Sequence, residues 1–358
     1  MPGQWADLHP DLLRHIYTKL YDPVDFICFR AVCKGWCTGA PPSERPPQFP
    51  LLLERNLDHK YSSEFKLYSL PTGKTYSLQL PEAQNKMFFG QSEGYLVTCR
   101  AVDHDCSPAL LNPFTRTELL LPFDNCYYFI PLYIGTTDPI RNPDGVVMLV
   151  YCHEKGQHRI GFWNKDEYNW GLRGADSCLQ RIISGRPVVF HKGRLFFIGY
   201  SWHITFECRL YAIDLTTGGK LFDVGFPDQI HRFDCLVDAP SALLGIVQHH
   251  LCSYDVALEE CWFEVYQLEE GEYPPHWTKL SNIGDLMIFL NPYNGFCVSA
   301  NGFHKFHGIR GNCIYFTRWN GNDHNSRRLI GRYELGEERS EVVGHPRETS
   351  GTWIVPNV

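Results

Sequence analysis

The cysteine and histidine side chains are the residues of this sequence best suited to metal binding. Cys28, Cys33 and Cys37 lie close together near the amino terminus, and His304 and His307 are separated by two residues. Structural zinc sites use C-x-x-C pairs, and a histidine pair needs a neighbouring carboxylate or cysteine to complete the ligand set. Neither condition is met at these positions. We therefore expect no metal site.

Glycine-rich motifs that bind phosphate are also missing. The pattern Gly-x-x-x-x-Gly-Lys-Ser/Thr does not occur, and no Gly-x-Gly-x-x-Gly follows a predicted strand. Nucleotide sites depend on such glycines, because they let the backbone approach the phosphates. We therefore expect a non-catalytic protein that binds no cofactor.

The composition favours a compact, β-rich protein. Of the 358 residues, 44% are hydrophobic, 14% are aromatic and only 20% are charged, which suits sheets better than a helical bundle. The net charge is −7 without a basic tract, so a nucleic acid is not an expected partner. No apolar stretch approaches the length that spans a membrane, so we expect no membrane association.

The cysteines and the amino terminus predict a reducing compartment. Fourteen cysteines are scattered along the chain, often within apolar runs, where a free thiol acts as a small hydrophobic side chain. The amino terminus lacks the basic and then apolar pattern of a signal peptide. We therefore expect a cytoplasmic or nuclear location.

The first forty residues read as two short helices. Apolar side chains recur every four residues from Leu8 to Leu20, which places them along one side of a helix. Pro10 fits its first turn, where the missing amide would have had no partner. Asp22-Pro23 breaks this helix, and residues 24–36 predict a second one. Helices this short rarely fold alone, so we expect another protein to stabilise them.

This stretch resembles the F-box in three ordered motifs: Leu8-x-Pro10-x-Leu12-Leu13-x-x-Ile16, Leu20-x-Asp22-Pro23-x-Asp25 and Arg30-Ala31-Val32-Cys33-Lys34-x-Trp36. The resemblance implies docking on a Skp-type adaptor and, through it, on a cullin-RING ubiquitin ligase. The adaptor-binding residues that it implies are Leu8, Pro10, Leu12, Leu13, Ile16, Leu20, Val32, Cys33 and Trp36.

The remaining chain divides into a linker and a large domain. We expect residues 1–40 to form the helical module and residues 41–50, with five prolines, to form a stiff linker. From residue 51 to residue 358, short apolar runs alternate with turn residues. One example is the run 65–70, which is followed by the turn 71–74 and the run 75–80, as in a β-hairpin.

The spacing of these turns predicts a β-propeller. Turn centres fall near residues 73, 116, 167, 218 and 258, which gives intervals of about 40 to 50 residues, the length of a four-stranded blade. A domain of this size would hold six or seven blades. An assembly of two-sheet β-sandwiches is the alternative. The expected fold is thus mainly β, with a small α-helical module followed by a propeller.

The large domain also resembles the Kib-type propeller of plant F-box proteins. The resemblance rests on residues 88–98 and 111–115 and on carboxy-terminal stretches, namely 276–290, 296–300, 311–317 and 352–356. Tyr95 stands where family members more often have tryptophan, a difference that affects packing only.

The two resemblances imply the substrate-recognition subunit of a Skp-cullin-F-box ubiquitin ligase. The helical module would bind the adaptor, and the propeller would bind a target protein that the sequence does not identify. Two alternatives stay open. One is a propeller enzyme or small-ligand-binding protein with a helical appendage, and the other is an F-box protein that acts outside the ligase.

Overall fold

A computed structural model describes much of the chain. The described residues are 5–45, 47–55, 62–92, 94–102, 105–120, 132–135, 146–152, 157–163, 171–172, 187–200, 208–214, 220–250, 257–271, 274–291, 294–303, 306, 308–320, 327–337, 339–346 and 350–356.

The amino-terminal module consists of three short helices, α1 (Pro10–Tyr17), α2 (Pro23–Arg30) and α3 (Lys34–Gly39). Both α1 and α2 begin with proline, whose fixed φ suits the first helical turn. The Asp22 carboxylate caps α2 by accepting a hydrogen bond from the Val24 amide at 2.9 Å. The helices enclose a small apolar core of their own, made of Leu13, Tyr17, Phe26, Phe29 and Ala40.

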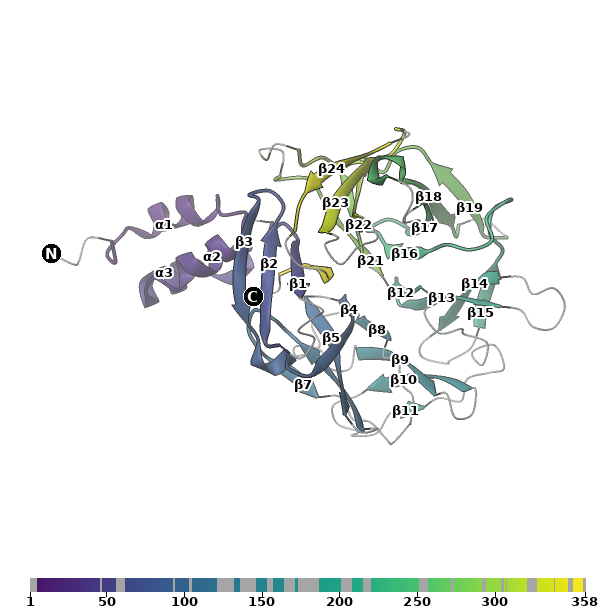
Figure 1. The fold of residues 1–358 in the computed structure, drawn as a ribbon, viewed down its shortest axis with the longest axis horizontal. Helices are drawn as coiled ribbons and strands as arrows, with labels where there is room; N and C mark the ends of the chain where they lie inside the picture. Colours follow the sequence, from purple (N-terminus) through teal and green to yellow (C-terminus); the bar gives the residue numbers. More distant parts are fainter. Residues whose placement is uncertain are drawn as a thin grey trace.

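The large domain is a ring of sheets around a centre (Figure 1). In hydrogen-bonded order the sheets are β25 (Ser350–Ile354), β1 (Leu51–Arg55), β2 (Glu64–Ser69) and β3 (Lys74–Gln79); β4 (Lys86–Ser92), β5 (Tyr95–Val102), β6 (Asp105–Leu111) and β7 (Glu118–Leu120); β11 (Gly171–Leu172), β10 (Gln157–Trp163), β9 (Val146–Cys152) and β8 (Leu132–Gly135); β12 (Val188–His191), β13 (Arg194–Tyr200), β14 (Cys208–Asp214) and β15 (Lys220–Val224); β16 (Cys235–Asp238), β17 (Leu243–His249), β18 (Trp262–Glu269) and β19 (His276–Leu280); and β21 (Gly295–Ser299), β20 (Leu286–Leu290), β22 (Cys313–Asn320), β23 (Arg327–Glu334) and β24 (Ser340–Gly344).

This arrangement confirms the predicted mainly β fold with a propeller and a small helical module. Of the six sheets that form the ring in the described residues, five have the four strands of a regular blade, where six or seven blades were predicted. The last sheet has five strands, and β20 pairs in parallel with β22 instead of forming a regular antiparallel meander. Dividing the chain length by a blade length could not reveal this irregular sheet.

The ring is closed by strands from the two ends of the domain. Strand β25 pairs with β1, so that Leu52 lies opposite Trp353. On the other side of β25, the buried Asn291 amide donates to the Trp353 carbonyl at 3.1 Å, and its oxygen accepts from the Trp353 amide at 2.7 Å. Asn291 follows β20, so these two bonds join the last sheet to the first.

Residues 41–50 differ from the stiff, extended linker that the prolines predicted. A short 3-10 helix, η1 (Pro42–Glu44), begins the segment, and Phe49 is buried with its ring 5.5 Å from that of Phe289. The Gln48 side-chain amide donates to the Leu20 carbonyl at 3.2 Å. The segment therefore packs against both the helices and the propeller, because Phe49 provides an apolar anchor among the prolines.

Candidate functional site

Three large apolar side chains of the helical module are exposed. Leu12 is 56% exposed, Ile16 37% and Val32 55%. Leu12 and Ile16 are four residues apart on α1, so their side chains lie on the same side of the helix. Large exposed apolar side chains in a group are typical of a surface that binds another protein.

The other predicted adaptor-binding residues occupy several environments. Leu13 is only 3% exposed and lies in the core of the module, so it supports the helices rather than their outer surface. Pro10 is exposed, and Cys33 is partly buried at the start of α3. Leu8, Leu20 and Trp36 are partly buried against the module core. Trp5, which the sequence prediction did not include, is 74% exposed.

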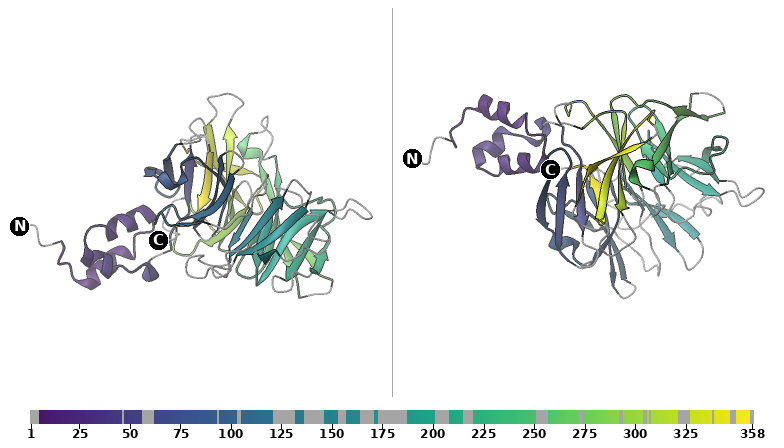
Figure 2. Two further views of the ribbon diagram at one scale, coloured as in Figure 1. Left: turned by 90° about the horizontal axis from the view of Figure 1, so that it is seen from below. Right: turned by 45° about the horizontal axis from the view of Figure 1, so that its top comes forward.

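The module is attached to the propeller by the turn between α1 and α2 (Figure 2). The Asp22 carboxylate accepts hydrogen bonds from the Tyr76 hydroxyl at 3.2 Å and from the Thr72 hydroxyl at 3.4 Å. Burial and the neighbouring Asp22 charge raise the pKa of Tyr76, so the phenol stays protonated as a donor. The Tyr21 ring packs edge-on against Phe306, with centroids 5.7 Å apart. These contacts leave Leu12 and Ile16 exposed.

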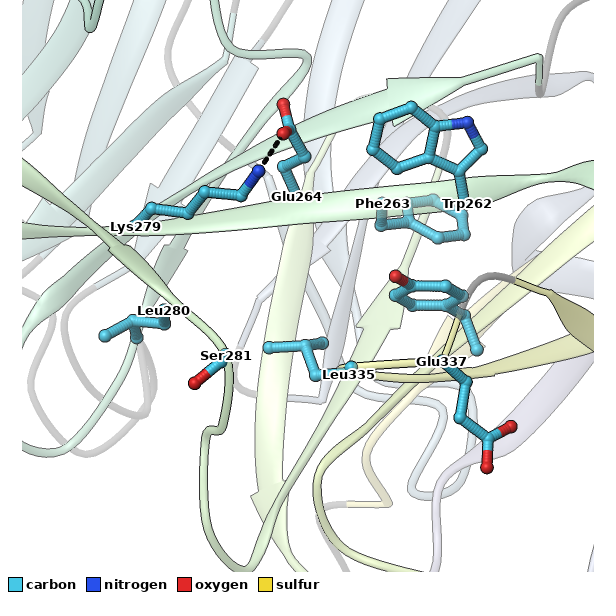
Figure 3. A pocket seen from close by; sticks show the side chains of 10 residues that line it. Trp262, Phe263, Glu264, Lys279, Leu280, Ser281, Leu335 and Glu337 are labelled. Carbon is cyan, nitrogen blue, oxygen red and sulfur yellow. Dashed lines mark hydrogen bonds and ion pairs between the residues drawn. The ribbon is translucent and has the colours of Figure 1, made fainter.

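A pocket of about 660 Å³ lies between β18 and β19 of one sheet and the β23–β24 connection of the next (Figure 3). It is lined by aromatic, aliphatic, polar and charged residues and one glycine, namely Trp262, Phe263, Glu264, Lys279, Leu280, Ser281, Tyr333, Leu335, Gly336 and Glu337. Mainly apolar walls with a few polar groups are typical of ligand-binding pockets. The sequence predicted strands here but not the pocket, because its lining comes from segments far apart in the chain.

The charges of this pocket are partly paired. Glu264 accepts a hydrogen bond from Lys279, and its other oxygen is 3.4 Å from the His249 ring and 3.3 Å from the Tyr266 hydroxyl. Burial would raise the pKa of Glu264, but Lys279 and His249 outweigh burial and hold that pKa below its usual value. Burial of the Tyr266 hydroxyl and the neighbouring charge of Glu264 raise the pKa of Tyr266 to about 12. Glu264 is therefore ionised, and its charge is balanced by Lys279.

A second group of ionisable side chains joins two neighbouring sheets. The His191 ring, 1% exposed on β12, has Nδ1 2.5 Å from the Asp238 carboxylate at the end of β16. Its Nε2 is 3.9 Å from Glu270, which also pairs with Arg194. Asp238 lies in the sheet next to that of His191, and Glu270 directly follows strand β18 of the same neighbouring sheet, so this group connects two blades. The imidazole is buried between them and is hardly accessible to solvent.

The candidate metal ligands are not assembled into a site in the described residues. Cys28, Cys33 and Cys37 are free thiols, and no group of three or more potential ligands was found in the ranges that the structure describes. His304 and His307 lie outside those ranges. Within the described helices, none is long and apolar enough to cross a membrane.

One further sequence pattern has a structural explanation. Residues 90–94 have the spacing Gly-x-Ser-x-Gly, which in hydrolases lies on a turn from a strand to a helix. Here Gly90 and Ser92 lie in β4, and Gly94 immediately precedes β5, which pairs antiparallel with β4. The local fold therefore differs from that of a nucleophile elbow.

The ring of blades and the attached helices define a β-propeller protein with an amino-terminal helical module. The KIB1-4 beta-propeller family model matches residues 67–340. The chain belongs to this family, as its resemblance to the Kib-type propeller of plant F-box proteins predicted.

Two Arabidopsis thaliana proteins resemble nearly the whole chain. The F-box/kelch-repeat protein At5g24040 is 23% identical over 361 residues, which cover 94% of this chain and 92% of the relative. The F-box protein At4g35733 is 24% identical over 352 residues, which cover 88% and 89%. Among solved structures, TolB from Acinetobacter baumannii aligns with a TM-score of 0.49 and 9% identity, over 85% of this chain and 66% of TolB.

Proposed function

We propose that this protein is the substrate-recognition subunit of a Skp-cullin-F-box ubiquitin ligase. The exposure of Leu12 and Ile16 is the observation that carries this proposal. The module already has a core of its own, with Leu13 and Tyr17 inside, and it is held to the propeller at Tyr21 and Asp22. The leucine and isoleucine that remain outside are suited to an apolar groove of a Skp-type adaptor.

Burial of these side chains would supply a useful part of the binding energy. Full burial of a leucine or isoleucine side chain contributes up to about 1.5–3 kcal/mol. Val32, also exposed, would add to this where the adaptor reaches the end of α2. The partly buried Leu8, Leu20, Cys33 and Trp36 would form the edge of the same interface, and Pro10 would shape the start of α1.

In this proposal the propeller binds a target protein and the chain performs no proton transfer. The ligase would bring a ubiquitin-carrying enzyme close to the target, and the high effective concentration would accelerate the transfer. Nine of the cysteines in the described ranges are free thiols, which is consistent with a reducing cytoplasm or nucleus as the place of action.

The double substitution Leu12→Asp and Ile16→Asp tests the adaptor interface. We expect it to abolish co-purification of a Skp-type adaptor, because two carboxylates would have to be desolvated in an apolar groove. Both positions are exposed, so the melting temperature of the free chain should be unchanged. Leu221→Asp, at an exposed leucine of β15, is the matched control and should retain the adaptor.

The same preparation tests the complete assembly. A cullin should be recovered with the adaptor when wild-type chain is used as bait, and it should be lost with the double variant. Full adaptor binding by a folded double variant would refute the interface. Recovery of the adaptor without any cullin would refute the role in a ligase.

A further inference from the structure

The pocket between β18, β19 and the β23–β24 connection lies where β19 stops pairing with β18. Strand β18 begins at Trp262, but β19 pairs with it only as far as Leu280 opposite Val265. The first three residues of β18, Trp262 to Glu264, therefore extend beyond the described pairing with β19. These same residues line the pocket.

The register shows which main-chain groups point into this opening. Gln248 lies opposite Phe263, and the Gln248 amide donates to Asp234 at 2.9 Å, on the side away from β18. The two residues are therefore a non-hydrogen-bonded pair of the antiparallel ladder. The amide and carbonyl of Phe263 consequently point toward the pocket. Because Phe263 is only 2% exposed, these groups are not accessible as a strand edge, and a ligand would enter the pocket by a side chain.

The charge of the pocket selects the type of side chain that such a peptide would carry. Lys279 already neutralises Glu264, whereas Glu337 is exposed and has no ion-pair partner among the described residues. In the view of Figure 3, Glu337 lies across the pocket from the Glu264–Lys279 pair, with Leu335 between them. The remaining net charge is negative, which favours a cation.

The walls favour a cation with an apolar and planar surface. Trp262, Phe263 and Tyr333 contribute aromatic rings, and Leu280 and Leu335 contribute aliphatic surface. A guanidinium group stacks on aromatic rings and donates several hydrogen bonds in one plane, and its methylene stem packs on apolar surface. An ammonium group lacks the planar surface for such stacking.

We propose that this pocket binds an arginine side chain of a target protein. Glu337 accepts hydrogen bonds from the guanidinium, and the aromatic and leucine side chains of the lining contact its stem. The target protein as the source of the arginine rests on the proposed function. The chemistry of the pocket does not depend on it.

The test uses the full chain and two tripeptides, acetyl-Thr-Arg-Thr-amide and its citrulline analogue, which has nearly the same shape but no charge. Ligand-observed saturation-transfer NMR gives the two dissociation constants. We expect the citrulline peptide to bind roughly three- to tenfold more weakly, because a charge-assisted hydrogen bond is lost. Glu337→Gln should remove this difference by weakening the arginine peptide alone. Glu64→Gln, an exposed carboxylate of β2 outside the pocket, should preserve it.

Equal binding of the two peptides by the wild-type chain would overturn the proposal, as would an unchanged arginine preference in Glu337→Gln. Failure to detect the arginine peptide at millimolar concentration would also overturn it. None of these measurements involves the adaptor, so the outcome is independent of the adaptor interface.

Discussion

Replacement of Asn291 by leucine should open the ring at its closing strand. The Asn291 side chain forms hydrogen bonds to both the amide and the carbonyl of Trp353 on β25, and both residues are buried. Leucine has a similar volume but can neither donate nor accept. A buried polar group left without a partner costs about 1–3 kcal/mol, so the two groups together predict a loss of about 2–6 kcal/mol. This is a large part of the 5–15 kcal/mol typical of a folded domain.

Urea denaturation monitored by tryptophan fluorescence and circular dichroism measures this loss. Hydrogen exchange locates it, because the amides that β1 and β25 share should exchange faster, whereas those of β17 and β18 should change less. Asn282→Leu is the control, since among the described residues the Asn282 side chain bonds to the Gly284 amide alone, in an exposed turn. If Asn291→Leu destabilises the chain no more than Asn282→Leu, the assigned closing role of Asn291 is wrong.

Two further predictions concern the core. Gly245→Ala should lower the free energy of unfolding by about 1–3 kcal/mol, because its Cβ would lie 2.6 Å from the Phe233 ring. Gly271→Ala, which has open space around the added Cβ, should not, and equal losses in urea denaturation would contradict the packing argument. Burial raises the pKa of Tyr315 to about 12, above the value near 10 of an unfolded tyrosine. Its contribution to stability is therefore complete below about pH 10 and is lost as the pH rises toward 12, so Tyr315→Phe should flatten the decline in denaturation midpoint between these pH values, and an equally steep decline would refute this.

The amino-terminal helices show what the sequence could predict and where it was ambiguous. The recurrence from Leu8 to Leu20 correctly predicted a helix, but it did not show which side would be buried. A helix turns once in 3.6 residues, so a repeat of four drifts around the axis. Leu13 and Tyr17 face inward, while Leu12 and Ile16 face solvent. A sequence with apolar residues on two sides does not distinguish an internal core from a surface awaiting a partner.

In the propeller, too, some features were predictable from the sequence and others were not. Local alternation and turn residues predicted its strands, because those signals depend on neighbouring residues. The parallel pairing of β20 with β22 and the bonds of Asn291 depend on contacts between distant segments, which spacing alone does not encode. The pocket depends on where β19 stops pairing with β18 and on a connection from the next sheet, which local spacing does not encode.

The pairing of β1 with β25 has a consequence for synthesis of the chain. The ribosome makes β1, β2 and β3 first, whereas β25 emerges only after every other described strand. Until then the β1 edge that β25 will cover has unpaired amides and carbonyls and is a template for incorrect pairing with other chains. A nascent chain that stalls before residue 350 therefore exposes an unpaired, aggregation-prone strand edge. Chaperones that bind such edges should associate with the chain until translation is complete.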